Sequence, residues 1–107
     1  AAELTHATTY IDARIAAGWT ADRIVVATML PRGSGGSLVN ETTRSTYNAG
    51  LVALASSKGS RLAALHSDAL IGAGGSQSNA TYYVDTIHLT DAGQKIAMGI
   101  IYGTIWP

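Results

Sequence analysis

The chain has 107 residues, of which 47% are apolar and 13% charged, and its seven basic and seven acidic side chains cancel. This length and composition predict one domain with a buried core and argue against disorder. No run of Lys or Arg offers an electrostatic footprint for nucleic acid, and no apolar stretch approaches the roughly 20 residues of a membrane span. Because cysteine is absent, thiol catalysis, disulfides and cysteine-ligated zinc are excluded.

The N-terminal segment has the pattern of an amphipathic helix. Side chains recur at helical spacing at Leu4, Thr8, Ile11 and Ile15. Gly18 follows this series, and glycine is a common residue at a helix C-terminus because it tolerates a left-handed conformation. We therefore expect a helix that ends just before Gly18.

A buried strand is predicted next. Residues 24–30 form a continuous, β-branched apolar run that stops at Pro31, which is typical of a strand covered on both faces in a parallel sheet. The loop at residues 32–37 follows the carboxyl end of this strand, where α/β sheets bind ligands, so we expect it to form a wall of a substrate cleft. Arg32 is a candidate to hydrogen-bond a substrate oxygen, with pairing to an acid as the alternative.

A second helix and strand complete a βαβ unit. Helical spacing runs from about residue 42 to Lys58, and Gly59 follows as a stop. Residues 61–66 then predict a shorter apolar strand. Strand, crossover helix and strand indicate an α/β fold with a parallel sheet.

The C-terminal part contains a polar loop and a third helix. Residues 72–81 are rich in Gly, Ser, Gln and Asn and predict a surface loop. The last helix is expected to start near Thr90 or Asp91, where a side-chain oxygen can cap it. This helix is apolar on nearly every side, so we expect it to pack against more than one neighbour.

Asp85 and His88 are the residues most indicative of chemistry, since they stand three positions apart in the turn before that helix. Such a turn can place the carboxylate on one ring nitrogen, which fixes the tautomer and leaves the other nitrogen free to accept a proton. In the alternative interpretation, Asp85 only caps the turn and His88 is a surface residue. A metal site that adds His66 and Asp68 lacks supporting ligand spacing.

The run Asp-x-x-His-Leu-Thr-Asp-Ala-Gly at residues 85–93, followed by an apolar helix, resembles the C-terminal catalytic block of SGNH, or GDSL-type, esterases. The order of elements over residues 1–107 is similar to the C-terminal half of that fold, a three-layer α/β/α sandwich of flavodoxin-like type with a parallel sheet of about five strands. The resemblance implies one incomplete domain, with His88 as the catalytic base, Asp85 as its orienting group, and no metal or other cofactor.

The nucleophile of that family is missing from this sequence. Neither a Gly-Asp-Ser-type block nor a Gly-x-Asn-Asp-type block is present, although these supply the serine and much of the oxyanion hole. The loop serines do not form a G-x-S-x-G elbow; they are Ser34, Ser37, Ser76 and Ser78. The resemblance therefore implies a partner, the N-terminal half of the same enzyme.

Two N-x-[ST] sequons lie in polar segments and predict glycosylation at Asn40 and Asn79, and hence a secreted protein. Tyr82 and Tyr83, beside the catalytic turn, are candidates to line the substrate cleft. Together these features favour an esterase that removes small acyl groups, with acetyl groups on a plant-wall polysaccharide as the preferred substrate. The alternative is a noncatalytic fragment or interaction module that binds a partner through an unpaired sheet edge.

Overall fold

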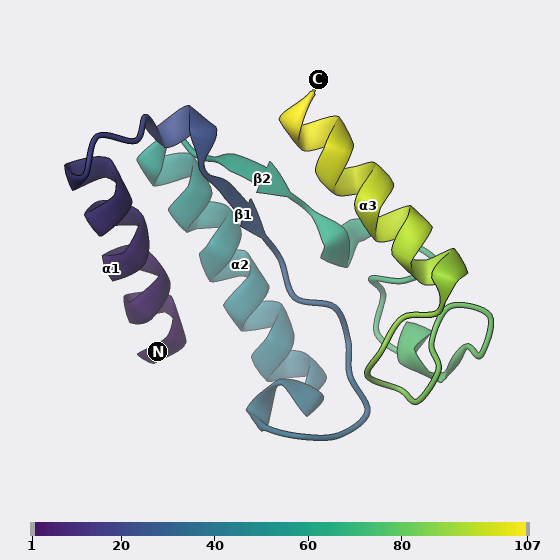
Figure 1. Cartoon of the computed structure of the whole chain (residues 1–107). Helices are drawn as coiled ribbons and strands as arrows, with labels where there is room; N and C mark the ends of the chain where they lie inside the picture. The colour runs from purple at the N-terminus through teal and green to yellow at the C-terminus, as the bar shows by residue number, and fades with distance from the viewer. Residues whose placement is uncertain (1, 107) are drawn as a thin grey trace.

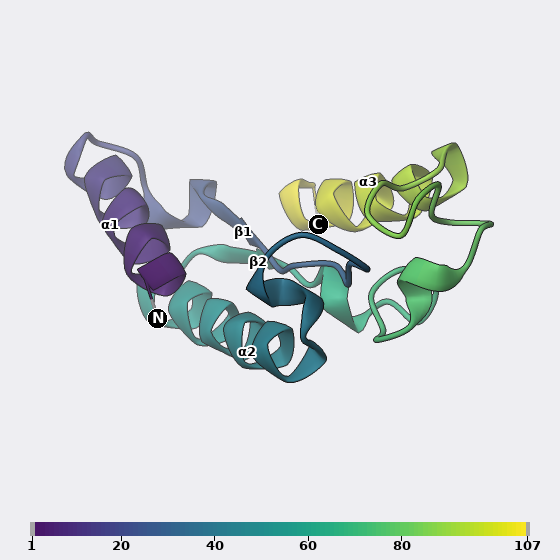
Figure 2. The ribbon, with the colours of Figure 1, turned by 90° about the horizontal axis from the view of Figure 1, so that it is seen from below.

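The computed structural model describes residues 2–106 and has a mixed α/β architecture built around a two-stranded parallel sheet. In chain order the elements are α1 (Ala2–Ala16), β1 (Val25–Ala27), α2 (Glu41–Lys58), β2 (Arg61–Ala63) and α3 (Asp91–Ile105). Helix α2 covers one face of the sheet and α3 the other, while α1 packs beside α2 (Figures 1 and 2). The predicted α/β class is therefore confirmed.

The first two helices form where the sequence predicts them. Helix α1 ends before Gly18, which adopts a φ of 103°. Helix α2 begins after Asn40, whose side-chain oxygen accepts a hydrogen bond from the Thr43 N–H at 3.0 Å. It ends at Lys58, and the left-handed conformation of the next residue, Gly59, lets the chain turn directly into β2.

The strands are shorter than expected. The prediction of a strand over residues 24–30 is wrong beyond Ala27, and the second strand ends at Ala63 rather than at residue 66. The reason is that β2 runs into a 3₁₀ turn at Leu65–Ser67, so the extended chain that follows β1 has no strand to pair with. Local apolar character predicted the extended conformation but not the length of the ladder.

One edge of β1 has no strand beside it. Just before and just after β1, the Ile24 carbonyl accepts a hydrogen bond from the Arg61 N–H, and the Thr28 N–H donates to the Ala63 carbonyl. Every second residue of this extended segment therefore points its main-chain groups at β2. The main-chain groups of Val25 and Ala27 therefore point to the opposite edge. Within residues 2–106 this edge is unpaired.

Two hydrophobic clusters lie on the two sides of the sheet. The first is formed between the first two helices and β1, with Ile11, Val26 and Leu51 at its centre. The second lies under α3 and includes Ile71 and Ala97.

Helix α3 packs along one side and leaves its other apolar side exposed. Met98 and Tyr102 on the other side are 47% and 58% exposed. The expectation that this helix packs against more than one neighbour is met, because α3 contacts both strands and the segment that carries Ile71 and Tyr83. Among the described residues, no helix is both long enough and apolar enough to cross a bilayer.

Candidate active site

Asp85 and His88 lie at the tip of a tight hairpin that leads into α3. The Val84 N–H donates to the His88 carbonyl at 2.8 Å, and the Thr90 N–H donates to the Tyr82 carbonyl at 2.9 Å. Thr90 also caps α3, because its hydroxyl oxygen accepts a hydrogen bond from the Gly93 N–H at 3.2 Å. The helix and the hairpin therefore share one residue, which fixes the turn relative to the helix.

The Asp85 carboxylate uses its two oxygens for different purposes. Oδ1 accepts hydrogen bonds from the main-chain N–H groups of Ile87 at 3.0 Å and of His88 at 2.7 Å. Oδ2 lies 2.7 Å from Nδ1 of the His88 imidazole. The same carboxylate caps the turn and contacts the imidazole, so the interpretation in which Asp85 only caps the turn is wrong, whereas the catalytic role of the pair stays a prediction.

These hydrogen bonds favour the ionised carboxylate and lower the pKa of Asp85 to about 2. The His88 N–H is the largest cause, followed by the His88 imidazole and then the Ile87 N–H. A carboxylate that is an anion at neutral pH accepts a hydrogen bond from Nδ1, so that ring nitrogen carries a proton and Nε2 has a free lone pair. The His88 side chain is 73% exposed, which leaves Nε2 open to a reacting group.

The loop after β1 lies against this turn. The Gly33 N–H donates to the Thr86 carbonyl at 2.8 Å, which joins the predicted cleft wall to the Asp85–His88 hairpin. A cavity of about 250 Å³ opens here, and its lining includes Arg32 and Ile87. Arg32 is thus beside the site, where its Nε donates to the Ser34 carbonyl at 2.8 Å and stiffens the loop.

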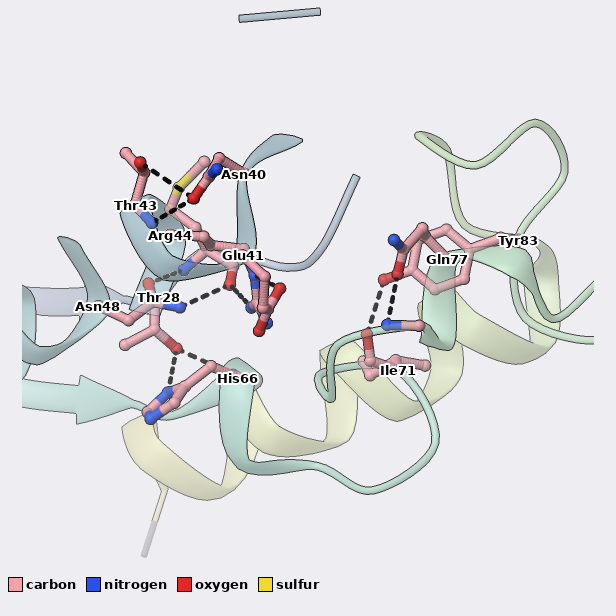
Figure 3. A network of polar contacts seen from close by, with 12 residues as sticks. Thr28, Asn40, Glu41, Thr43, Arg44, Asn48, His66, Ile71, Gln77 and Tyr83 are labelled. Carbon is pink, nitrogen blue, oxygen red and sulfur yellow. Dashed lines mark hydrogen bonds and ion pairs between the residues drawn. The ribbon is translucent and has the colours of Figure 1, made fainter. Parts of the chain in front are cut away.

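Of the two tyrosines predicted to line the cleft, Tyr83 has a different role. Tyr83 is only 2% exposed, its hydroxyl donates to the Ile71 carbonyl at 2.7 Å, and burial raises its pKa (Figure 3). Its proposed place in the cleft wall is therefore wrong, because the side chain fills the second cluster beneath α3. Tyr82 is half-buried and packs against the same cluster.

A buried polar group that the sequence analysis did not single out supports the carboxyl end of β1. Arg44 binds the Glu41 carboxylate through two nitrogens, and its Nη1 donates to the Met29 carbonyl at 2.9 Å (Figure 3). The Glu41 carboxylate also lies close to Gly74, in the loop that leads to the hairpin, where a Cβ would be 2.9 Å from its Cδ. This group could have been found from the sequence by the helical spacing of Glu41, Arg44 and Asn48, which places these polar side chains on one face of α2.

The other candidate residues remain apart from the hairpin. Nδ1 of His66 lies 2.9 Å from the Thr28 hydroxyl (Figure 3). In the described part of the chain, no hydrogen bond joins His66 to His88, whose Nδ1 contacts Asp85. Within residues 2–106, no three His, Asp or Glu side chains gather in a way that would hold a metal ion. None of the serine hydroxyls in that part of the chain is hydrogen-bonded to His88 either.

Both sequon asparagines are exposed, and their side-chain oxygens are engaged locally. Asn40 caps α2, as described above, and the Asn79 oxygen accepts from the Thr81 N–H at 3.0 Å. In the described region no hydrogen bond occupies either Nδ2, which is the atom a glycan would modify.

Comparison with known proteins gives no relative, since no protein-family model, curated protein or solved structure matches the chain. The functional argument therefore depends on the hairpin itself. An imidazole held by an ionised carboxylate, with its second nitrogen exposed, can act as a general base toward a hydroxyl group brought to it.

Proposed function

We propose that this chain is the C-terminal part of an SGNH-type serine esterase and supplies its Asp85–His88 base pair. The observation that carries the proposal is the 2.7 Å contact between Oδ2 of Asp85 and Nδ1 of His88, within a turn whose N–H groups hold the other carboxylate oxygen. The similarity of residues 85–93 to the catalytic block of that family is its second support.

In the proposed reaction, Nε2 of His88 takes the proton of a serine hydroxyl as the serine oxygen attacks the ester carbonyl. The imidazolium then gives this proton to the departing alcohol, which leaves an acyl-enzyme. Water hydrolyses the acyl-enzyme in a second step, with His88 again accepting and returning a proton. Asp85 stabilises the imidazolium and holds the ring in the required orientation.

The serine and the oxyanion hole come, in this proposal, from an N-terminal half that pairs with the open edge of β1. That edge has unpaired main-chain groups at Val25 and Ala27, although helices cover both faces of the sheet. A strand added beside β1 would satisfy those groups. The exposed apolar side of α3 near Met98 offers further surface to be covered.

The substrate is proposed to be a small acyl ester, with acetyl groups on carbohydrate preferred, and the protein to be secreted and glycosylated. Support comes from the exposed sequon residues Asn40 and Asn79 and from the absence of net charge, which suits a neutral polysaccharide better than an ionic ligand.

The test is reconstitution with a half that carries a Gly-Asp-Ser block. Intact-mass analysis of the native preparation would identify such a second chain, and hydrolysis of p-nitrophenyl acetate would measure activity. We expect activity from the assembled enzyme, its loss in His88→Ala, and no loss in the control His6→Ala, which removes an exposed imidazole from α1. Wild-type rates in His88→Ala would refute the proposal.

The open edge of β1 also favours a second candidate, a noncatalytic module that binds a partner by strand addition. This function predicts a stable complex without ester hydrolysis, and it predicts that His88→Ala leaves the affinity for the partner unchanged.

A further inference from the structure

Thr86 adopts an unusual backbone conformation in the middle of the catalytic turn. Its φ is 65°, and within the described part of the chain it is the one non-glycine residue with positive φ. The left-handed region is unfavourable for a β-branched side chain such as threonine, because Cβ and its substituents crowd the backbone. Such a conformation persists only where surrounding contacts hold it, and it is common at functional sites.

The contact that holds Thr86 comes from the loop after β1. The Gly33 N–H donates to the Thr86 carbonyl at 2.8 Å. A Cβ at position 33 would overlap the Thr86 hydroxyl oxygen and lie 2.6 Å from its Cβ, so the close approach requires glycine. The three atoms nearest to that missing Cβ all belong to the Thr86 side chain.

The conformation of Thr86 determines where the next two N–H groups point. Its positive φ reverses the chain between Asp85 and Ile87, so that the N–H groups of Ile87 and His88 both face Oδ1 of Asp85. The same carboxylate then has only Oδ2 left for the imidazole of His88. A different conformation at Thr86 would separate these donors from the carboxylate.

We propose that Gly33 and Thr86 form a clasp that holds the Asp85–His88 turn in the conformation that orients the imidazole. Neither residue touches the reacting atoms, so both are positioning residues. The clasp joins the wall of the cleft to the base. Its catalytic consequence depends on the proposed esterase function, whereas its structural consequence does not.

The first test follows the Asp85 carboxyl by NMR titration of the full chain, without substrate. Gly33→Ala should displace the turn, remove the N–H donors from Oδ1, and raise the titration midpoint from about 2 towards 3.8. Thr86→Gly should keep the midpoint low, because the main-chain bond from Gly33 remains and glycine adopts positive φ freely. Ser34→Ala, an exposed change in the same loop, is the matched control.

The double variant Gly33→Ala/Thr86→Gly distinguishes loss of the clasp from a general loss of structure caused by the substitution at position 33. It removes the side-chain atoms that the new methyl group would meet, so the low midpoint should return. If Gly33→Ala unfolds, recovery of both the fold and the low midpoint in the double variant supports the clasp. A wild-type midpoint in folded Gly33→Ala, or no recovery in the double variant, overturns it.

The assembled enzyme gives a separate readout. Gly33→Ala should lower kcat at least tenfold with little change in KM, and the double variant should recover most of that loss. Unchanged kcat in Gly33→Ala would overturn the positioning role. The Asp85 midpoint could change as predicted in Gly33→Ala and in the double variant while no preparation hydrolyses esters. In that case the clasp is supported and the proposed function is refuted.

Discussion

The side-chain amide of Asn48 pairs with both main-chain groups of Met29. Oδ1 accepts from the Met29 N–H at 2.7 Å, and Nδ2 donates to the Met29 carbonyl at 3.0 Å (Figure 3). This is the pattern that a neighbouring strand would make with an extended chain. A helix side chain thus takes over hydrogen bonding just beyond the end of β1 and fixes the chain before it enters the Arg32 loop.

Asn48→Leu should destabilise the protein. Asn48 is buried, so the substitution leaves the Met29 N–H without its partner, at a cost of about 1–3 kcal/mol in the free energy of unfolding. Urea denaturation at a fixed protein concentration measures this loss. Thr46→Ala, an exposed change on the same helix, is the control, and a loss no greater than that of the control would contradict the prediction.

The fold was predictable where its determinants are local. Asn40 and Gly59 mark the ends of α2 because a capping side chain and a left-handed glycine act on their own neighbours. The length of the strand after Ile24 was not predictable in this way. Its apolar run continues to Leu30, but the ladder stops where β2 turns away, and Asn48 binds the chain at Met29 beyond it.

In the candidate site, too, contacts between residues close in sequence were predictable and contacts between distant segments were not. Asp85 and His88 are close in sequence, so their spacing and the resemblance of residues 85–93 together predicted the contact between carboxylate and imidazole. The role of Tyr83 depends on Ile71 and the underside of α3, which no local pattern reveals. The contact of Gly33 with Thr86 joins segments far apart in the chain, and it was likewise beyond prediction from sequence.

The open edge of β1 should make the chain self-associate when it is alone. Unpaired main-chain groups at Val25 and Ala27 form a template for another strand, and sedimentation should show mass increasing with concentration. Ala27→Pro should reduce this association, because it removes an outward N–H while the bonds of Val26 and Thr28 to β2 remain. A cooperative, monomeric melt of the wild-type chain would contradict the inference that it is half of a domain.

The Asp85 pKa should stay below 3.8 in His88→Ala. The largest cause of the lowered pKa is the main-chain N–H at position 88, which alanine also has. The N–H of Ile87 is unchanged in this variant as well. Because the folded pKa lies below the unfolded value, the ionised carboxylate stabilises the turn above about pH 4, and this contribution disappears as the pH falls through about 2. An NMR titration that returned to 3.8 in this variant would identify the imidazole as the main cause instead.

In the assembled enzyme, His88→Ala should lower kcat by roughly 10³-fold or more with little change in KM, since it removes the base. Asp85→Asn should lower kcat less, because it disturbs the orientation of the ring and leaves the base in place. Asp85 should contribute no titration to the pH–rate profile near neutral pH, because its carboxylate is already ionised there. Equal losses in the two variants would contradict separate roles for base and orienting group.

A phosphonate ester separates the serine mechanism from a metal-dependent one. The proposed reaction forms a covalent bond between a serine oxygen and the acyl carbon, so a phosphonate should add to one serine of the N-terminal half and abolish activity. Mass spectrometry would locate the adduct, and this chain without its partner should remain unlabelled, because no serine of residues 2–106 is hydrogen-bonded to His88. A chelator should leave the rate unchanged. Loss of activity with chelator, and no covalent label, would instead indicate a metal-dependent site that recruits His66 and His88 in the assembled enzyme. In this chain the two imidazoles have separate hydrogen-bond partners, Thr28 and Asp85.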